Sequence, residues 1–341
     1  MKNIFKGLTL ALAVSLAFAT TTFASTLING AGSTFAEPVY TKWFNEYQKT
    51  EKDSQFNYQG IGSGAGIKQL MAGTVDFAGS DVPMNKEETI QAKTPVLHIP
   101  VAMGAVVVTY NIDLKNPLKL NGAVLADIFS GKITQWSDAK IKALNKGVAL
   151  PDTAIAVATR SDGSGTTAVF TEYLAKSSPA WVGKNGKTVN WFKGSLGGKG
   201  NAGVAGLVKQ TPGAIGYVEL VYALENKLPF ADIQNKAGQF VTASAKAVSN
   251  AAAGSTKEAL AQDFKISITD SKAKDAYPIS SFTWMLVYDH MGAEKGAAVK
   301  KFATWAMSDS AQNLASTINY APVPKDLRAA VLKKIEKIEI K

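Results

Sequence analysis

Short apolar runs, each followed by a glycine-containing loop and then by apolar residues at helical spacing, recur along the first third of the chain. Residues 26–28 and 55–59 predict strands, and residues 35–49 predict an amphipathic helix with proline in its first turn, where proline is tolerated. A glycine-rich loop over 60–66 leads into a short predicted helix over 67–72. This repeated order of strand, loop and helix predicts an α/β fold.

The same periodicities extend over the rest of the chain, with gaps. They predict strands over 75–78, 100–111, 154–159, 213–218 and 281–288, and helices over 122–129, 138–145, 166–176, 204–210, 298–306 and 327–340. Residues 191–203 are interpreted as a glycine-rich loop, of which residues 198–203 would close over the cleft in lobe II. Residues 235–275 give weak signals, apart from a helix that is possible over 256–263.

Two long apolar strands, one near residue 105 and one near residue 284, divide the chain into a first, a middle and a last part. This division predicts two lobes that are joined by a two-strand hinge. Lobe I would combine residues 25–103 with 283–341, and lobe II would hold residues 104–282. A cleft between two lobes is a common ligand site, and hinge closure can bury the ligand.

The first 24 residues have the composition of a cleaved signal peptide. Lys2 and Lys6 precede an apolar run over 8–18 and a small-residue pattern over 22–24. The run is too short to span a bilayer, and no later window is long and apolar enough to do so. We therefore expect export to the periplasm, with no direct membrane span.

Composition narrows the function classes. The 341 residues contain no cysteine, which excludes disulfides, thiolate metal sites and a lipid anchor on an N-terminal cysteine. The formal net charge of +10 favours anionic partners. Nucleic acid is not expected, because the lysines are scattered and form no run of five or more basic residues. We expect a monomer with no cofactor and no metal.

Residues 160–167, RSDGSGTT, hold the strongest chemical signal, because they lie where a predicted strand becomes a helix. The first turn of a helix has unpaired backbone N–H groups and a partial positive charge, so it suits an anion. Ser164 and Thr166 add hydroxyl donors, Gly165 allows close approach, and Arg160 adds a planar fork. Taken alone, the segment also fits a serine cap beside a surface turn.

Two further loops offer the same chemistry at predicted helix starts, one at Thr34 and Phe35 and one at Ser63. Asp81 follows the strand predicted over 75–78, at the carboxyl end where ligands of open α/β sheets bind. Helix starts that converge from two lobes would surround a tetrahedral oxyanion with donors. We therefore expect these loops to share one cavity.

Several motifs resemble the periplasmic phosphate-binding proteins of bacterial phosphate ABC transporters, the PstS family. The motifs are GAGSTFAEPVYTKW at 30–43, NYQGIGSGAGIKQ at 57–69, TVDFAGSD at 74–81, RSDGSGTTAVFTEYL at 160–174 and LGGKGNAGVAGLVKQTPGAIGYVE at 196–219. The resemblance covers nearly all of the chain after residue 24. It implies a type II hinged fold with two α/β lobes, inorganic phosphate as ligand and delivery to a membrane permease.

The resemblance also implies a ligand set. The matching positions are Thr34, Phe35, Ser63, Asp81, Arg160, Ser164, Gly165 and Thr166. Phe35 and Gly165 would act through backbone N–H groups, and Asp162 would pair with the arginine. Two positions depart from the family pattern, Ser33 and Thr159, and neither removes a ligand.

A carboxylate in an anion site fits phosphate better than sulfate. Asp81 accepts hydrogen bonds, and the protonated oxygen of phosphate can donate one, whereas sulfate at neutral pH has no proton to give. Sites that match polar groups in this way discriminate by roughly 10⁴ to 10⁵. A receptor for sulfate, molybdate or a phosphonate remains the alternative within the binding class.

Two other classes stay open. An exported phosphatase would need an activated nucleophile or a metal, but His98 and His290 have no metal-ligand spacing, no GxSxG elbow occurs, and both histidines are interpreted as structural. GKGNAG at 198–203 matches the dinucleotide-binding glycine pattern, but no clear βαβ frame accompanies it. We expect a binding protein and no enzyme.

Overall fold

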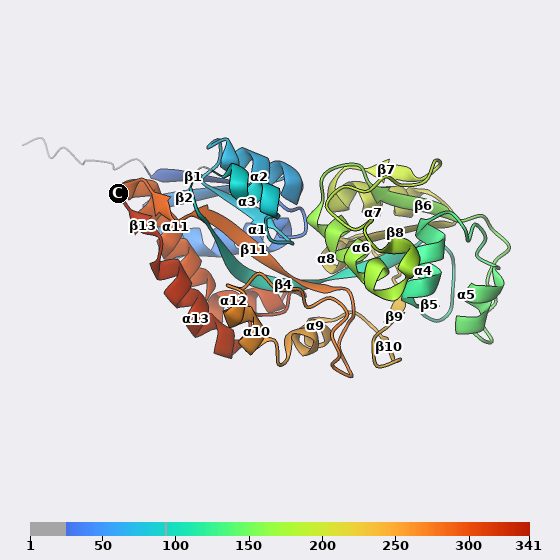
Figure 1. The fold of residues 1–341 in the computed structure, drawn as a ribbon. Helices are drawn as coiled ribbons and strands as arrows, with labels where there is room; N and C mark the ends of the chain where they lie inside the picture. The colour runs from blue at the N-terminus through green and yellow to red at the C-terminus, as the bar shows by residue number, and fades with distance from the viewer. Residues whose placement is uncertain (1–24, 93) are drawn as a thin grey trace, which may run out of the picture.

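The computed structural model describes residues 25–92 and 94–341, and the predicted signal peptide, residues 1–24, lies outside the described residues. The described chain forms two α/β lobes that lie side by side (Figure 1). The N-terminal strands and the C-terminal helices build lobe I together, and the middle of the chain builds lobe II. The predicted two-lobe α/β class is therefore confirmed.

Lobe I contains a mixed sheet with the strand order β2, β1, β3, β11, β4. β1 runs parallel to β2 and β3, and β11 runs antiparallel to β3 and β4. The strands are β1 (Thr26–Gly32), β2 (Ser54–Gly60), β3 (Phe77–Ser80), β4 (Val96–Tyr110) and β11 (Ser280–Tyr288), with a small pair, β12 (His290–Met291) and β13 (Glu339–Ile340). The helices are α1 (Glu37–Thr50), α2 (Ser63–Met71), α3 (Lys86–Gln91), α11 (Ala293–Ala306), α12 (Asp309–Ser316) and α13 (Lys325–Glu336).

Lobe II continues the sheet in the order β4, β8, β6, β7, with β8, β6 and β7 parallel to one another. The further strands are β6 (Ala156–Arg160), β7 (Leu196–Gly198), β8 (Ala214–Glu219) and a small sheet of β5 (Lys119–Leu120), β9 (Asp232–Gln234) and β10 (Phe240–Val241). The helices are α4 (Gly122–Phe129), α5 (Ala139–Leu144), α6 (Gly165–Ser177), α7 (Gly200–Gln210) and α8 (Leu220–Glu225), with a 3₁₀ turn at Pro179–Trp181.

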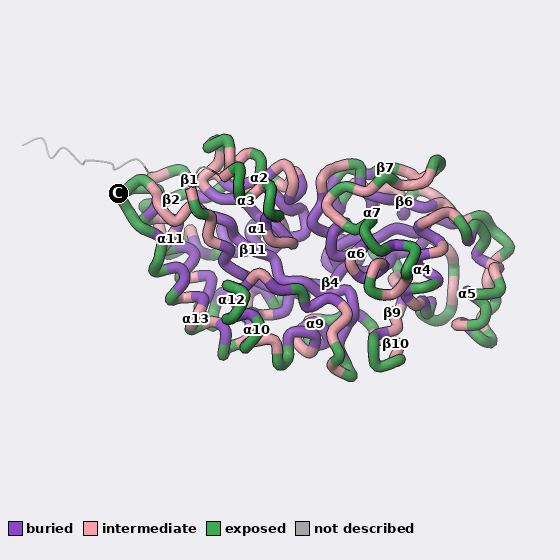
Figure 2. The backbone as a smooth tube through the Cα atoms, in the orientation of Figure 1, coloured by how far each residue is buried: buried purple, intermediate pink, exposed green. Residues whose placement is uncertain are grey.

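β4 joins the two lobes. Its first part pairs with β11, up to Ala105 opposite Ser280, and its last part pairs with β8, beginning at Val106 opposite Glu219. The strand is buried from His98 to Tyr110, and Figure 2 shows this buried backbone running through the junction. The length of this mostly apolar strand is therefore explained by burial in two successive cores.

The chain returns to lobe I after β10, through α9 (Ala245–Ala252) and α10 (Thr256–Ala261). The Nε1 of Trp284 on β11 donates to the Phe264 carbonyl at 3.0 Å, which ties the segment after α10 to lobe I. Asp270 then reaches back to Lys236 of lobe II at 3.6 Å. The boundaries predicted at residues 103/104 and 282/283 stay a prediction, and these contacts favour an earlier return, between β10 and α9.

α1 shows why the predicted helices form. Tyr40, Trp43, Phe44 and Tyr47 recur at helical spacing and are all buried. The rings of the last three pack against Phe302 of α11, as in the Phe44–Phe302 pair with a centroid distance of 5.1 Å, and the Tyr40 ring packs against Phe77 of β3. Burying a large apolar side chain stabilises the fold by about 1.5–3 kcal/mol, so this aromatic face holds α1 on the sheet.

Several predicted segments differ from the structure. α2 begins at Ser63, inside the loop predicted over 60–66, and α11 begins at Ala293, five residues before the predicted start. The loop predicted over 191–203 contains β7, and α7 already begins at Gly200, four residues before the predicted helix start. A Cβ at Gly198 would lie 2.6 Å from the Val204 nitrogen, so glycine here permits α7 to pack onto β7 and is no sign of a loop. The C-terminal helix ends at Glu336, earlier than predicted, and α9 lies in the segment of weak signals.

Candidate functional site

The predicted helix starts of the two lobes meet at their junction. A Cβ built on Gly165 of lobe II would lie 2.5 Å from Asp81 Oδ2 and 2.9 Å from the Asp81 Cβ of lobe I. Beside them the Gly64 N–H at the start of α2 donates to the Gly163 carbonyl of lobe II at 2.9 Å. The lobes are therefore in contact through these loops.

All eight predicted residues fall in this cluster and are buried. They are Thr34, Phe35 and Ser63, then Asp81, and Arg160, Ser164, Gly165 and Thr166. These loops lie together, and the shared cavity and the contact with a ligand stay predictions for each of the eight residues. The loops lie between elements of both lobes, so ligand capture would require the lobes to open.

Asp81 is fully buried and accepts two hydrogen bonds from hydroxyl groups. Ser33 Oγ donates to Oδ2 at 2.5 Å, and Thr283 Oγ1 on β11 donates to Oδ1 at 2.9 Å. Burial raises the pKa of Asp81 to about 6, although hydrogen bonds from Ser33, Thr283 and Ser63 and the charge of Arg160 all lower it. At neutral pH the carboxylate is therefore mostly ionised and can accept a further proton donor.

Arg160 ends β6 and supplies the positive charge. Its Nε and Nη2 donate to the two carboxylate oxygens of Asp162 at 2.7 and 2.6 Å, so the predicted pair is present. Burial raises the pKa of Asp162, but the hydrogen bond and charge of Arg160 outweigh burial and hold it below its usual value. The third nitrogen, Nη1, is buried with no hydrogen-bond partner among the described residues. Such a donor costs about 1–3 kcal/mol unless a ligand satisfies it.

α6 presents its N-terminus to the cluster. Ser164 is the N-cap, and its Oγ accepts from the Thr167 N–H at 3.0 Å. Gly165 and Thr166 are the first two helical residues, and their backbone N–H groups have no acceptor within the helix. These groups and the helix dipole favour an anion at this point.

Three residues outside the predicted set hold the cluster together. Ser33 accepts from the Phe35 N–H at 3.0 Å while it donates to Asp81, and Thr283 donates to Asp81 from β11. Asn201 near the start of α7 contacts both Thr34 and Thr166. Ser33 lies inside one of the motifs quoted above, and Thr283 is a polar residue in an apolar strand. Either position could have marked the residue as a candidate from the sequence.

The two histidines have structural partners, as predicted. His98 Nε2 accepts from the Met84 N–H at 3.0 Å, and burial lowers the pKa of His98 to about 3. His290 lies between Asp289 and Glu339, at 2.6 and 2.9 Å. Within residues 25–92 and 94–341 no group of three His, Cys, Asp or Glu side chains is placed to hold a metal ion.

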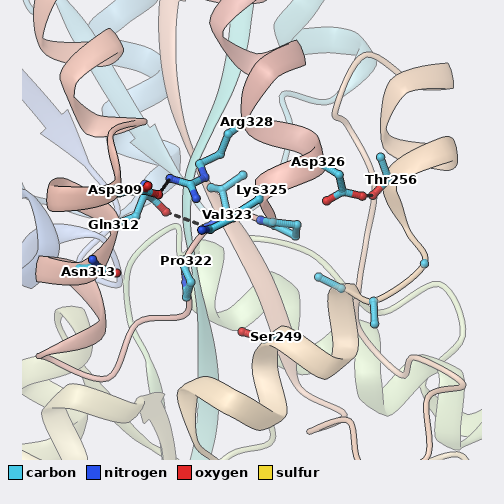
Figure 3. Close-up of a pocket in the computed structure, with 14 residues that line it drawn as sticks. Ser249, Thr256, Asp309, Gln312, Asn313, Pro322, Val323, Lys325, Asp326 and Arg328 are labelled. Carbon is cyan, nitrogen blue, oxygen red and sulfur yellow. Dashed lines mark hydrogen bonds and ion pairs between the residues drawn. The ribbon is translucent and has the colours of Figure 1, made fainter.

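A pocket of about 380 Å³ lies elsewhere, on lobe I between the α9–α10 loop, α12 and α13 (Figure 3). Arg328 and Asp309 form an ion pair of 2.8 Å at its side, and Lys325 and Asp326 supply one charge of each sign. The pocket shares no residue with the buried cluster. Its balanced charge gives no preference for an anion.

Comparison with known proteins agrees with this geometry. A model of the PBP superfamily domain matches residues 19–310. The chain is 42% identical over 308 residues to a phosphate-binding protein PstS of Xylella fastidiosa strain 9a5c, which covers 89% of this chain and 83% of that protein. The chain belongs to the PstS family of the PBP superfamily. The resemblance expected from the motifs is therefore confirmed.

Two further matches extend this assignment. A phosphate-binding protein PstS of Pasteurella multocida strain Pm70 is 43% identical to this PstS-family chain over 335 residues, 95% of this chain and 93% of the relative. A solved phosphate-binding protein from Stenotrophomonas maltophilia superposes with a TM-score of 0.70 at 21% identity, over 91% of this chain and 94% of that one. At that identity the superposition supports the fold alone, and it confirms the predicted fold class.

In the part of this PstS-family chain that the structure describes, no helix is both long enough and apolar enough to cross a membrane.

Proposed function

We propose that this protein captures inorganic phosphate between its two lobes and delivers it to the membrane permease of an ABC transporter for import. The eight buried residues would bind the ligand, with Gly165 acting through its backbone N–H group and Phe35 through an N–H group that it would share between Ser33 Oγ and the ligand. Arg160 and the start of α6 would offset the charge of the anion. Asp162 would hold the guanidinium in place.

The observation that most supports the proposal is that Asp81, a buried carboxyl group, lies among hydrogen-bond donors. Asp81 is the only carboxylate among the eight residues, and burial raises its pKa to about 6. Above that pH it is an acceptor that a protonated phosphate oxygen satisfies, whereas sulfate would place two negative groups together. Donors elsewhere in the cluster suit the unprotonated oxygens of either anion, so Asp81 is the group that discriminates.

A titration of residues 25–341 with phosphate, arsenate and sulfate, followed by tryptophan fluorescence, tests the proposal. Phosphate and arsenate share shape and protonation, so both should bind with one ion per chain. Sulfate should bind more weakly by roughly 10⁴-fold or more. Equal affinity for sulfate and phosphate would refute the proposed ligand.

We also propose that residues 1–24 direct export and are removed, so that the mature protein begins near Ser25 in the periplasm. N-terminal sequencing of protein from the periplasmic fraction of a producing bacterium checks this. A start at Met1, or recovery in the cytoplasm alone, would contradict it. Cross-linking of the phosphate-loaded protein to a permease in membranes tests the delivery step, which fails if loading does not alter cross-linking.

We propose no catalytic role. Ser164 donates no proton to a histidine among the described residues, and both histidines have the other partners described above. The test is release of phosphate from an aryl phosphate by the purified protein. Release that is lost in Arg160→Ala would favour the phosphatase alternative.

A further inference from the structure

Asn201 lies between the lobes and is fully buried. It is the second residue of α7, and its Oδ1 accepts from the Glu219 N–H at 2.9 Å. Only an oxygen can accept this hydrogen bond, so the side-chain amide has one possible orientation. The Nδ2 group therefore faces away from Glu219.

On that side, Asn201 donates three hydrogen bonds to two threonines. Nδ2 donates to Thr34 Oγ1 at 2.8 Å and to Thr166 Oγ1 at 3.2 Å, and the backbone N–H of Asn201 donates to Thr34 Oγ1 at 3.1 Å. A hydroxyl group has two acceptor lone pairs and one hydrogen. Asn201 occupies both lone pairs of Thr34, so this hydroxyl can act toward any other group only as a donor.

We propose that Asn201 is a positioning residue that turns the hydroxyl hydrogen of Thr34 toward the bound anion, while Thr166, which accepts one hydrogen bond from Asn201, keeps a free lone pair. This inference rests on the proposed function, because both threonines belong to the proposed phosphate set. A hydroxyl that is free to rotate can present either its hydrogen or a lone pair, and a lone pair repels an oxyanion. Asn201 removes that choice as the lobes close over the ligand, so no lone pair of the Thr34 hydroxyl faces the anion in the closed state.

Glu219, whose N–H group donates to the Asn201 side chain, is itself held in place. Glu219 is fully buried at the end of β8, opposite Val106 of the strand that crosses between the lobes. Its Oε2 accepts from the Val221 N–H at 2.7 Å and caps α8. Thr34 belongs to lobe I and Asn201 to lobe II, so the same hydrogen bonds also join the lobes when they close.

A double-mutant cycle separates positioning from general support. Phosphate dissociation constants are measured by calorimetry for wild type, Asn201→Ala, Thr34→Val and the double variant. If Asn201 acts through the Thr34 hydroxyl, Asn201→Ala weakens binding by about 10-fold in the wild type and by about 2-fold in Thr34→Val. Losses that multiply in the double variant would overturn the proposal, because support that is independent of the hydroxyl gives no coupling.

Two further variants keep the test decisive. Asn201→Asp keeps the shape and the bond from Glu219 but cannot donate from its side chain, so binding should weaken by about 100-fold, again less in Thr34→Val. This cycle answers the question if Asn201→Ala does not fold. Asn313→Ala, at an exposed asparagine of α12, is the matched control and should bind as the wild type does. Absence of phosphate binding by the wild type would overturn both the proposed function and this role, whereas binding without coupling would overturn this role alone.

Discussion

Gly165→Ala tests whether the lobes must close tightly for binding. Gly165 is the first residue of α6, where alanine suits the backbone better than glycine. The added Cβ would lie 2.5 Å from Asp81 Oδ2 and 2.9 Å from the Asp81 Cβ, across the junction of the lobes. Ordinary contacts need about 3.5–4 Å, so the lobes would have to stay about 1 Å further apart.

The expected loss of phosphate affinity can be judged from the hydrogen bonds that depend on lobe closure. The bonds from Gly64 N to Gly163 O and from Asn201 Nδ2 to Thr34 Oγ1 measure 2.9 and 2.8 Å. An added separation of about 1 Å places both beyond hydrogen-bond range, and it moves ligand donors of one lobe away by the same amount. If two of these donors lose their hydrogen bonds to the charged ligand, the cost is about 3–6 kcal/mol, which corresponds to a 10²- to 10⁴-fold weaker affinity.

Calorimetry gives the phosphate dissociation constant, and thermal unfolding without ligand gives the stability. Gly206→Ala is the matched control, because Gly206 also lies in a helix of lobe II and a Cβ there meets nothing within 4 Å. Gly206→Ala should be as stable as the wild type or more stable by about 0.5–1 kcal/mol, whereas Gly165→Ala should lose about 1–3 kcal/mol with the two hydrogen bonds between the lobes, and only Gly165→Ala should lose affinity. Wild-type affinity in Gly165→Ala would refute the closed geometry.

Three further predictions concern the buried acids. Asp81→Asn should raise sulfate affinity by about 10- to 100-fold in competition calorimetry, because a neutral amide replaces the negative carboxylate that faces the anion; an unchanged phosphate-to-sulfate ratio would count against the discriminating role. Burial raises the pKa of Asp81 to about 6, so the group is a carboxylate above and an acid below that pH, and sulfate affinity of the wild type should rise as the pH falls through 6 but stay level in Asp81→Asn. Burial also raises the pKa of Glu219 well above its usual value, so the stability it contributes is present below the unfolded pKa and is lost as the pH rises toward the folded pKa. In denaturant titrations, the free energy of unfolding of Glu219→Gln should therefore exceed that of the wild type by an amount that grows by about 1.4 kcal/mol for each pH unit above about pH 4.3. A difference that does not change with pH would show that Glu219 does not titrate in this way.

Local sequence patterns predicted most of the fold. Apolar runs located β4 and β11, and apolar spacing located α1 and α6, because these elements bury one face or both in a core. β7 was missed because Gly197 and Gly198 give no apolar signal, although glycine is what lets α7 approach it. α9 was missed because its buried face is mostly alanine, which marks a helix only weakly by periodicity.

Those parts of the candidate site that have a local sequence pattern could be predicted. Helix starts at Ser63 and at Ser164 are local features, and the motif resemblance joined them into one set. Asn201 was missed because its role depends on Thr34, which lies 167 residues away in the chain. Such a contact between lobes has no local pattern, and it becomes visible only when the chain is folded.

A crystal structure of residues 25–341 with phosphate, at a resolution that separates short hydrogen bonds, tests the central claim most directly. The account predicts one tetrahedral ion enclosed at the junction of the lobes, with Arg160 Nη1 as a donor. One phosphate oxygen should lie about 2.5–2.7 Å from an Asp81 carboxylate oxygen, as a proton donor to a carboxylate does. Phosphate bound elsewhere, or an Asp81 carboxylate that makes no contact with it, would contradict the account.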